Sequence, residues 1–199
     1  MPRPQPKNRE DRTASSTFSG RIGPDPSGGL VLRAPTVGDE AEARRAQAEL
    51  ADDGFDFLLM QDGECWAEWL ARIARERAGT GLPAGRVPAT FLLAVVGDDL
   101  VGRVSVRHEL NDFLLAVGGH VGYGVRPGRR RRGHATEILR QSLEMLRGLG
   151  LDRALVTCDD DNLGSIGTIE ACGGVLEDIR PGDPGEAAKR RYWIDLGPR

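Results

Sequence analysis

The most informative stretch of the sequence is Tyr123-Gly124-Val125-Arg126-Pro127-Gly128-Arg129-Arg130-Arg131-Arg132-Gly133-His134-Ala135-Thr136. It begins at the end of a short strand predicted over residues 120–125, and apolar residues at helical spacing follow from Ala135. A helix that starts here aims free backbone N–H groups and its positive dipole end at one point. Gly133 carries no side chain that could obstruct a ligand, and the arginines suit phosphate groups. The stretch therefore predicts an anion site where a strand gives way to a helix.

The segments on either side predict alternating strands and helices. In chain order we expect a strand over 30–35, helices over 39–50 and about 62–78, strands over 90–96 and 100–106, the strand over 120–125, a helix from Ala135 to Leu149, a strand over 153–158, a helix over 162–172, and a closing hairpin of 175–179 with 191–196. This order predicts an α+β fold with a mixed sheet flanked by helices.

Length and charge narrow the class of protein. The chain has 199 residues, and we expect residues 30–199 to form a single domain. Residues 1–29 are rich in Pro, Gly, Ser and charge, so they predict a disordered or loosely packed leader. No apolar run is long enough for a bilayer, and Met1–Glu10 lacks the apolar core of a secretory signal. We therefore expect a cytoplasmic protein without a membrane partner.

The net charge and the metal-ligating residue types argue against two further classes. The formal net charge is −3, so bulk electrostatics does not favour a nucleic-acid partner. The three cysteines and three histidines are scattered without metal-ligand spacing, which predicts neither a metal site nor a disulfide. They are Cys65, Cys158, Cys172, His108, His120 and His134.

The basic loop resembles a known motif. Arg130-Arg131-Arg132-Gly133-His134-Ala135 matches the [Gln/Arg]-x-x-Gly-x-[Gly/Ala] signature of the GNAT superfamily of N-acetyltransferases, and Val125-Arg126-Pro127 is similar to the strand end before it. The resemblance covers roughly residues 30–196. Further matches are Asn162, Ser165 and Gly173 in the family's next helix, and Arg107–Asn111, Gly118–Tyr123 and Arg191–Ile194, which resemble a bacterial branch of predicted acetyltransferases.

The resemblance implies a GNAT-like, mostly antiparallel central sheet of six to seven strands with helices on both faces. It also implies acetyl-CoA as co-substrate and direct acetyl transfer to a primary amine on a small molecule or a peptide. The pantetheine arm would pair with the strand edge, in an opening where the strand over 120–125 and the strand of Cys158 diverge, and a backbone N–H near Val125 would stabilise the developing oxyanion. The cofactor-binding residues implied in this way are Gly124, Val125, Arg130, Arg131, Arg132, Gly133, His134, Ala135, Thr136, Asn162 and Ser165.

The catalytic residues are less well specified by the sequence. An amine acceptor needs a base, and His120 is the first candidate because of its position on the cofactor strand and its ordinary pKa. The competing interpretation is a strand histidine satisfied by backbone hydrogen bonds. Glu109 is the second candidate base. Many family members protonate the thiolate with a tyrosine seven residues after the helix asparagine, but that position is Ile169 here. Either Tyr123 or water then serves, or the thiolate leaves without a dedicated acid.

Three residues are candidates for the acceptor site: His108, Asn111 and Trp66, although the stripe of Trp66 and Trp69 also fits a helix face in the core. Two other functions stay open, a non-catalytic acyl-CoA sensor and a basic nucleic-acid module. The sequence does not identify the acceptor, and a homodimer is also left open.

Overall fold

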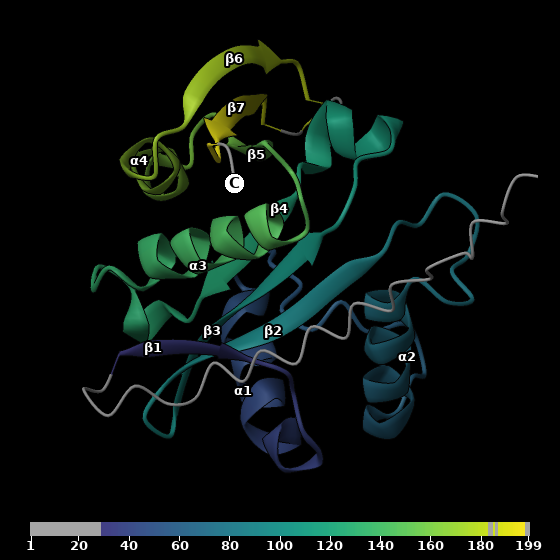
Figure 1. Ribbon diagram of the computed structural model, residues 1–199. Helices are drawn as coiled ribbons and strands as arrows, with labels where there is room; N and C mark the ends of the chain where they lie inside the picture. The colour runs from purple at the N-terminus through teal and green to yellow at the C-terminus, as the bar shows by residue number, and fades with distance from the viewer. Residues whose placement is uncertain (1–28, 183–184, 186, 198–199) are drawn as a thin grey trace, which may run out of the picture.

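The computed structural model describes residues 29–182, 185 and 187–197 (Figure 1). Apart from Gly29, the leader expected over 1–29 lies outside these residues. The elements are β1 (Leu30–Arg33), α1 (Glu40–Ala51), α2 (Trp66–Ala78), β2 (Ala89–Val96), β3 (Asp99–Arg107), β4 (Val121–Val125), α3 (His134–Gly148), β5 (Arg153–Asp159), α4 (Leu163–Ala171), β6 (Val175–Arg180) and β7 (Lys189–Asp195).

The strands form two antiparallel sheets. One has the order β1-β2-β3-β4 and the other the order β5-β7-β6. The predicted closing hairpin is present, with β7 placed between β5 and β6. The expected α+β architecture is therefore confirmed, and β4 and β5 are the strands at which the two sheets meet.

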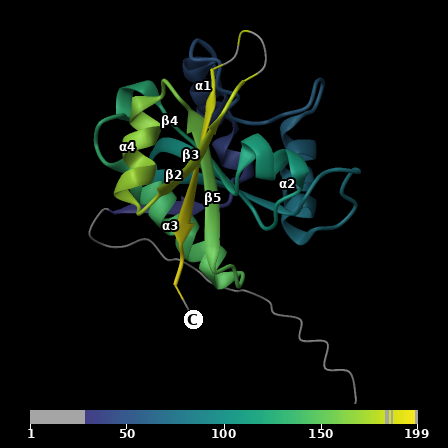
Figure 2. The ribbon, with the colours of Figure 1, turned by 90° about the horizontal axis from the view of Figure 1, so that it is seen from above.

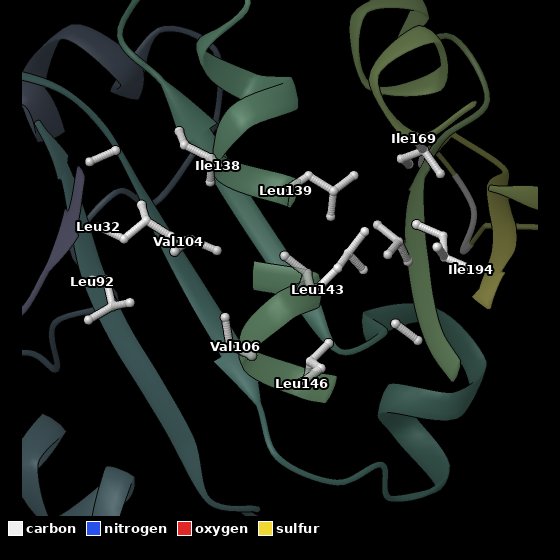
Figure 3. Close-up of a cluster of buried hydrophobic side chains, with 14 of the residues drawn as sticks. Leu32, Leu92, Val104, Val106, Ile138, Leu139, Leu143, Leu146, Ile169 and Ile194 are labelled. Carbon is white, nitrogen blue, oxygen red and sulfur yellow. The ribbon is translucent and has the colours of Figure 1, made fainter. Parts of the chain in front are cut away.

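The helices cover both faces of the larger sheet. In Figure 1, α1 and α2 lie on one face and α3 on the other, and Figure 2 shows α4 and α2 on opposite sides of β5. The buried side of α3 includes Ile138, Leu139 and Leu146 at helical spacing. Figure 3 shows this side between the strands of the larger sheet and two further side chains, Ile169 of α4 and Ile194 of β7 in the smaller sheet. One apolar core thus joins α3 to both sheets.

Two helical segments differ from the sequence-based prediction. Helix α2 begins at Trp66 rather than near residue 62, because Gly63 has a φ of 74° and a capping box of Cys65 and Glu68 starts the helix later. A short helical turn, Leu114–Gly118, lies between β3 and β4 and was not predicted. A short apolar run has no distinctive period, so the sequence could not separate it from a strand or a loop.

Two hydrogen bonds join β5 to His120, the residue just before β4. The backbone N–H of His120 donates to the carbonyl of Leu155 at 2.7 Å, and the N–H of Leu155 donates back to Nδ1 of the His120 ring at 2.9 Å. Beyond this point the two strands belong to different sheets. The opening between them therefore widens towards Val125 and Asp159, at the position that the sequence predicted.

A buried cation fixes the connection between α1 and α2 to the sheet. The guanidinium of Arg103 on β3 donates to the carbonyls of Asp56, Phe57 and Gly122 at 2.8–2.9 Å. It also lies 4.4 Å from the centroid of the Phe55 ring. Burial lowers the pKa of Arg103 to about 9, because its charge is removed from water without an ion-pair partner. The three carbonyls take the place of such a partner.

We expect Arg103→Leu to lower the free energy of unfolding by about 2–4 kcal/mol, because carbonyls that are now paired would lose their donor. Arg75→Leu on the exposed side of α2 is the control and should change it by less than about 0.5 kcal/mol. Urea denaturation measures both. Equal effects of the two substitutions would contradict the anchoring role of Arg103.

Candidate functional site

A cavity of about 590 Å³ lies where β4 and β5 part. Its wall combines the connection after α1, the end of β4, the basic loop, the start of α3 and one side of α4. The lining residues are Leu50, Asp53, Gly54, Phe55, Tyr123, Gly124, Val125, Arg129, Arg130, Arg131, Gly133, His134, Ala135, Thr136, Asp159, Asn162, Gly164, Ser165 and Thr168. Of the predicted cofactor residues, the structure brings all but Arg132 to this one cavity.

The start of α3 faces the cavity. Gly133 is the N-cap with a φ of 78°, and its carbonyl accepts the first helical hydrogen bond from the N–H of Glu137. The first-turn N–H groups, from His134 to Thr136, therefore have no partner within the helix. A Cβ at Gly133 would meet nothing within 4 Å, so the left-handed backbone is what requires glycine here.

Some arginines of the basic loop form ion pairs and others do not. Arg129 is paired with Asp99, and Arg130 with Asp53. Within the described ranges, Arg131 and Arg132 have no ion-pair partner. The sequence pattern could not make this distinction, because the partners Asp99 and Asp53 lie far from the loop in the chain.

Arg126, just before the loop, has a structural role that the sequence did not reveal. Its guanidinium is paired with Glu42 and Glu49 of α1 and donates to the carbonyl of Leu100 at 3.0 Å. It therefore fastens α1 to the end of β4, beside the cavity.

Strand β4 presents different surfaces on its two faces. On one face a Cβ at Gly124 would lie 2.4 Å from the ring of Phe55, so glycine permits this contact. On the other face Tyr123 points towards Ser165 and Thr168 of α4, and its buried hydroxyl has no hydrogen-bond partner among the described residues. Burial raises the pKa of Tyr123 to about 12, so the phenol is protonated near neutral pH.

Helix α4 closes the opposite wall. Asn162 is its N-cap, and its Oδ1 accepts the N–H of Ser165 at 3.0 Å, which leaves the amide NH₂ for a ligand. Thr168 lies one turn after Ser165 on the same side and was missed by sequence reasoning. The i, i+3 spacing from Ser165 was the signal that could have found it.

His120 is held by the backbone. Its Nδ1 accepts a hydrogen bond from Leu155, so in the neutral ring the proton is on Nε2. Burial lowers the pKa of His120 to about 4, with the charge of Arg107 acting in the same direction. The geometry matches the alternative interpretation of a backbone-satisfied histidine, and the role of base stays a prediction.

The other candidate residues after β3 differ in how far they are engaged in hydrogen bonds. His108 Nε2 lies 2.8 Å from the Thr90 hydroxyl. Asn111 donates to the carbonyl of Gly85 and accepts the N–H of Leu114, so it organises the turn before β4. Glu109 is exposed. Their predicted roles in base catalysis and acceptor binding stay predictions.

Trp66 and Ile169 belong to the core. Trp66 stacks on Trp69 with ring centroids 4.4 Å apart, and its indole N–H donates to the carbonyl of Thr36. It lies away from the lining of the cavity. Ile169 is fully buried under the smaller sheet. An apolar side chain packed in this way fills the position at which the GNAT resemblance implies a tyrosine.

Two features are absent from the described residues. These residues contain no cluster of three His, Cys, Asp or Glu side chains arranged to hold a metal ion. None of their helices combines the length and the apolar character that crossing a membrane requires.

Comparison with known proteins agrees with this architecture. A family model described as an acetyltransferase (GNAT) domain matches residues 30–175. No curated protein sequence matches the chain. Among solved structures, yncA, a putative acetyltransferase from Salmonella typhimurium with acetyl-CoA, is 15% identical with a TM-score of 0.59 and covers 85% of this chain and 95% of that chain.

Two further structures are similar to the chain. RimJ from Mycobacterium smegmatis, in complex with CoA-disulfide, is 21% identical with a TM-score of 0.61, over 85% of this chain and 83% of that one. The spermidine N-acetyltransferase from Vibrio cholerae, with CoA and spermine, is 17% identical with a TM-score of 0.58, over 84% and 95%. At these identities the likeness shows the fold.

The chain belongs to the GNAT family of acetyltransferases, because the family model spans most of its length. This membership confirms the resemblance that the basic loop indicated.

The bridge from His120 to Leu155 predicts a pH dependence of stability. The pKa of His120 is lowered in the folded protein, so between about pH 6.5 and 4 the unfolded chain binds the proton and the folded chain does not. Stability should therefore fall as the pH falls through this window. His120→Asn keeps an acceptor atom without the titration, and should flatten the slope by up to about 1.4 kcal/mol per pH unit.

Urea denaturation from pH 7 to 4.5 measures this difference. Contributions from His108 and His134 are common to both proteins and cancel in the comparison. Parallel slopes for the wild type and His120→Asn would contradict a neutral, buried His120.

Proposed function

We propose that this protein is an acetyl-CoA-dependent N-acetyltransferase that transfers the acetyl group directly to a primary amine. The observation that carries the proposal is the junction of β4 with α3. There, the first-turn N–H groups of α3 that have no partner within the helix meet at one cavity with Arg131, which has no ion pair among the described residues, and with the end of β4. This arrangement fits a pyrophosphate joined to an extended arm.

The residues of the cavity divide the binding between them. The first turn of α3 and Arg131 would hold the pyrophosphate. Residues 123–125 would offer backbone groups to the arm, and the free amide NH₂ of Asn162 would donate to it from the other wall. Arg130 has a carboxylate partner, Asp53, so it would have to exchange that partner for the pyrophosphate. The volume of about 590 Å³ suits a substantial part of such a ligand.

The reaction requires one bond exchange and two proton movements. The bound co-substrate supplies an acetyl thioester. As the C–N bond forms and the C–S bond breaks, the amine loses a proton and the departing thiolate gains one. The protein's own residues have to orient the amine, exclude water and conduct these protons.

Tyr123 is the residue we assign to the departing thiolate. Tyr123 lines the cavity, and its hydroxyl is buried without a hydrogen-bond partner in the described part of the chain. Its raised pKa, about 12, keeps it protonated until a strong base forms beside it. After donation, the phenolate would regain a proton that the amine has released to water. Tyr123 would thus replace the tyrosine that is absent at position 169.

The proton acceptor for the amine is assigned less directly. His120 presents a protonated Nε2 in its neutral state, so it suits a positioning role better than that of a base. Glu109, two residues after β3, is exposed, and it is the carboxylate we propose for this step, with water as the link to the amine.

Thr136→Glu tests the pyrophosphate site. A carboxylate in the first turn of α3 favours the helix but opposes a bound phosphate, so acetyl-CoA affinity should fall at least ~10-fold. Thr136→Gln has nearly the same shape without the charge and should bind within about threefold of wild type. Isothermal titration with acetyl-CoA measures both, and equal affinities of the two variants would place the pyrophosphate elsewhere.

Tyr123→Phe tests the assignment of the acid. The substitution removes only an unpaired hydroxyl, so acetyl-CoA affinity should stay within about twofold, while kcat should fall ~100-fold with an amine that the wild type acetylates. Thiol release measures kcat. An unchanged kcat would assign the proton to water. Binding of acetyl-CoA without turnover of any amine by the wild type would instead favour the acyl-CoA sensor.

A further inference from the structure

A second arginine of β3, Arg107, is placed very differently from Arg103. Both point to the face of the sheet that carries the connection between α1 and α2, because they are four residues apart on one strand. Arg103 has three carbonyl partners at 2.8–2.9 Å. Arg107 has one, the carbonyl of Gly118 at 3.4 Å. Most of its donors are therefore unused by the described part of the protein.

The guanidinium of Arg107 lies directly against β4. A Cβ at Gly122 would meet its Nη1 at 3.0 Å and its Nη2 at 3.3 Å. Gly122 thus makes room for Arg107 as Gly124, two residues on, makes room for Phe55. A rise of about 3.3 Å per residue puts these two glycines roughly 7 Å apart along β4. Arg107 therefore lies next to the cavity along β4, on the side of the closed end of the opening at His120.

The surroundings of Arg107 are cationic. Its positive charge interacts with those of Arg86 and Arg103. Within the described residues no carboxylate forms an ion pair with Arg107. Burial, followed by the charge of Arg86, lowers the pKa of Arg107, but an arginine stays charged at neutral pH. The residue is half-buried, so part of its side chain remains in contact with solvent.

A purely structural role explains this arrangement poorly. A half-buried cation with one long hydrogen bond loses hydration and gains little in return, whereas a bound anion would restore two parallel charge-assisted hydrogen bonds. Structural arginines elsewhere in the chain have such partners: Arg126 has two carboxylates, and Arg72 has Glu64 and Glu76.

We propose that Arg107 binds an anionic group, a carboxylate or a phosphate, on the amine acceptor. The inference rests on the proposed function, because it assumes that the acetyl end of the arm reaches the closed end of the opening. There the amine would face the thioester, and the anion of the same molecule would face Arg107 beside Gly122. The acceptor class is then a small molecule or peptide that carries both a primary amine and a nearby anion.

The test compares amines that differ only in the anion: phosphoethanolamine against ethanolamine, and β-alanine against its amide. Thiol release from acetyl-CoA gives kcat/KM for wild type, Arg107→Gln, Arg107→Lys and the exposed control Arg75→Gln. The wild type should prefer at least one anionic member by ~10-fold or more. Arg107→Gln should abolish this preference through KM, leave the neutral members unchanged, and be partly rescued by Arg107→Lys.

A second measurement does not depend on turnover. Inorganic phosphate and acetate are titrated into the full-length protein saturated with CoA, which occupies the pyrophosphate loop. Wild type and Arg75→Gln should bind one of the two anions, and Arg107→Gln should not. Which of them binds, together with the preferred pair of amines, distinguishes a phosphate from a carboxylate.

The outcomes separate the two proposals. Equal turnover of charged and neutral amines, with no anion bound by the CoA-saturated protein, would overturn the anion site and leave the acetyltransferase standing. Anion binding that depends on Arg107, without turnover of any amine, would support the anion site and count against acetyl transfer. Melting temperatures of the Arg107 variants within about 2 °C of wild type would show that the changes are local.

Discussion

The paired hydrogen bonds between His120 and Leu155 are the constraint on which the rest of the site depends. Among the described residues they join the start of β4 to β5, with a side-chain nitrogen as the acceptor of the Leu155 N–H. Beyond this point the two strands belong to different sheets, so their backbone groups do not pair with one another. An edge with unused backbone groups is thereby left facing a cavity, which is the condition for binding an extended ligand as an added strand.

Arginine is used for two opposite purposes around this opening. Arg103 and Arg126 are saturated by carbonyls or carboxylates and fasten α1 and its following connection to the sheet. Among the described residues Arg131 and Arg107 have no carboxylate partner, and Arg107 has one long hydrogen bond, to the carbonyl of Gly118. The two lie at the ends of the proposed path, Arg131 at the phosphate loop and Arg107 at the acceptor end. The same residue type thus provides either rigidity or binding capacity, depending on which acceptors the fold brings to it.

Local sequence patterns were sufficient for most of the fold. The strand, basic loop and helix over 123–136 were predicted in the correct order, because turn chemistry and helical periodicity are encoded within a few residues. The turn Leu114–Gly118 was missed for the opposite reason, since its short apolar run has no clear period. The later start of α2 depended on a cap made by Cys65 and Glu68, which the periodicity of the helix does not indicate.

The site was predicted less completely than the fold. The residues predicted to bind the cofactor lie on adjacent local motifs, and all but Arg132 line one cavity. The ion pairs of Arg129 and Arg130, the ring of Phe55 on Gly124, and the backbone partner of His120 all join residues that are distant in the chain. Only tertiary structure distinguishes a histidine that accepts a backbone N–H from one that is available as a base.

A crystal structure of the full-length protein with CoA tests the central claim most directly. The account predicts the pyrophosphate at the first turn of α3, the arm along Tyr123–Val125 between β4 and β5, and the sulfur at the end of the opening that His120 and Leu155 close. A pyrophosphate bound away from α3, or an arm lying outside the opening with β4 and β5 unchanged, would contradict it.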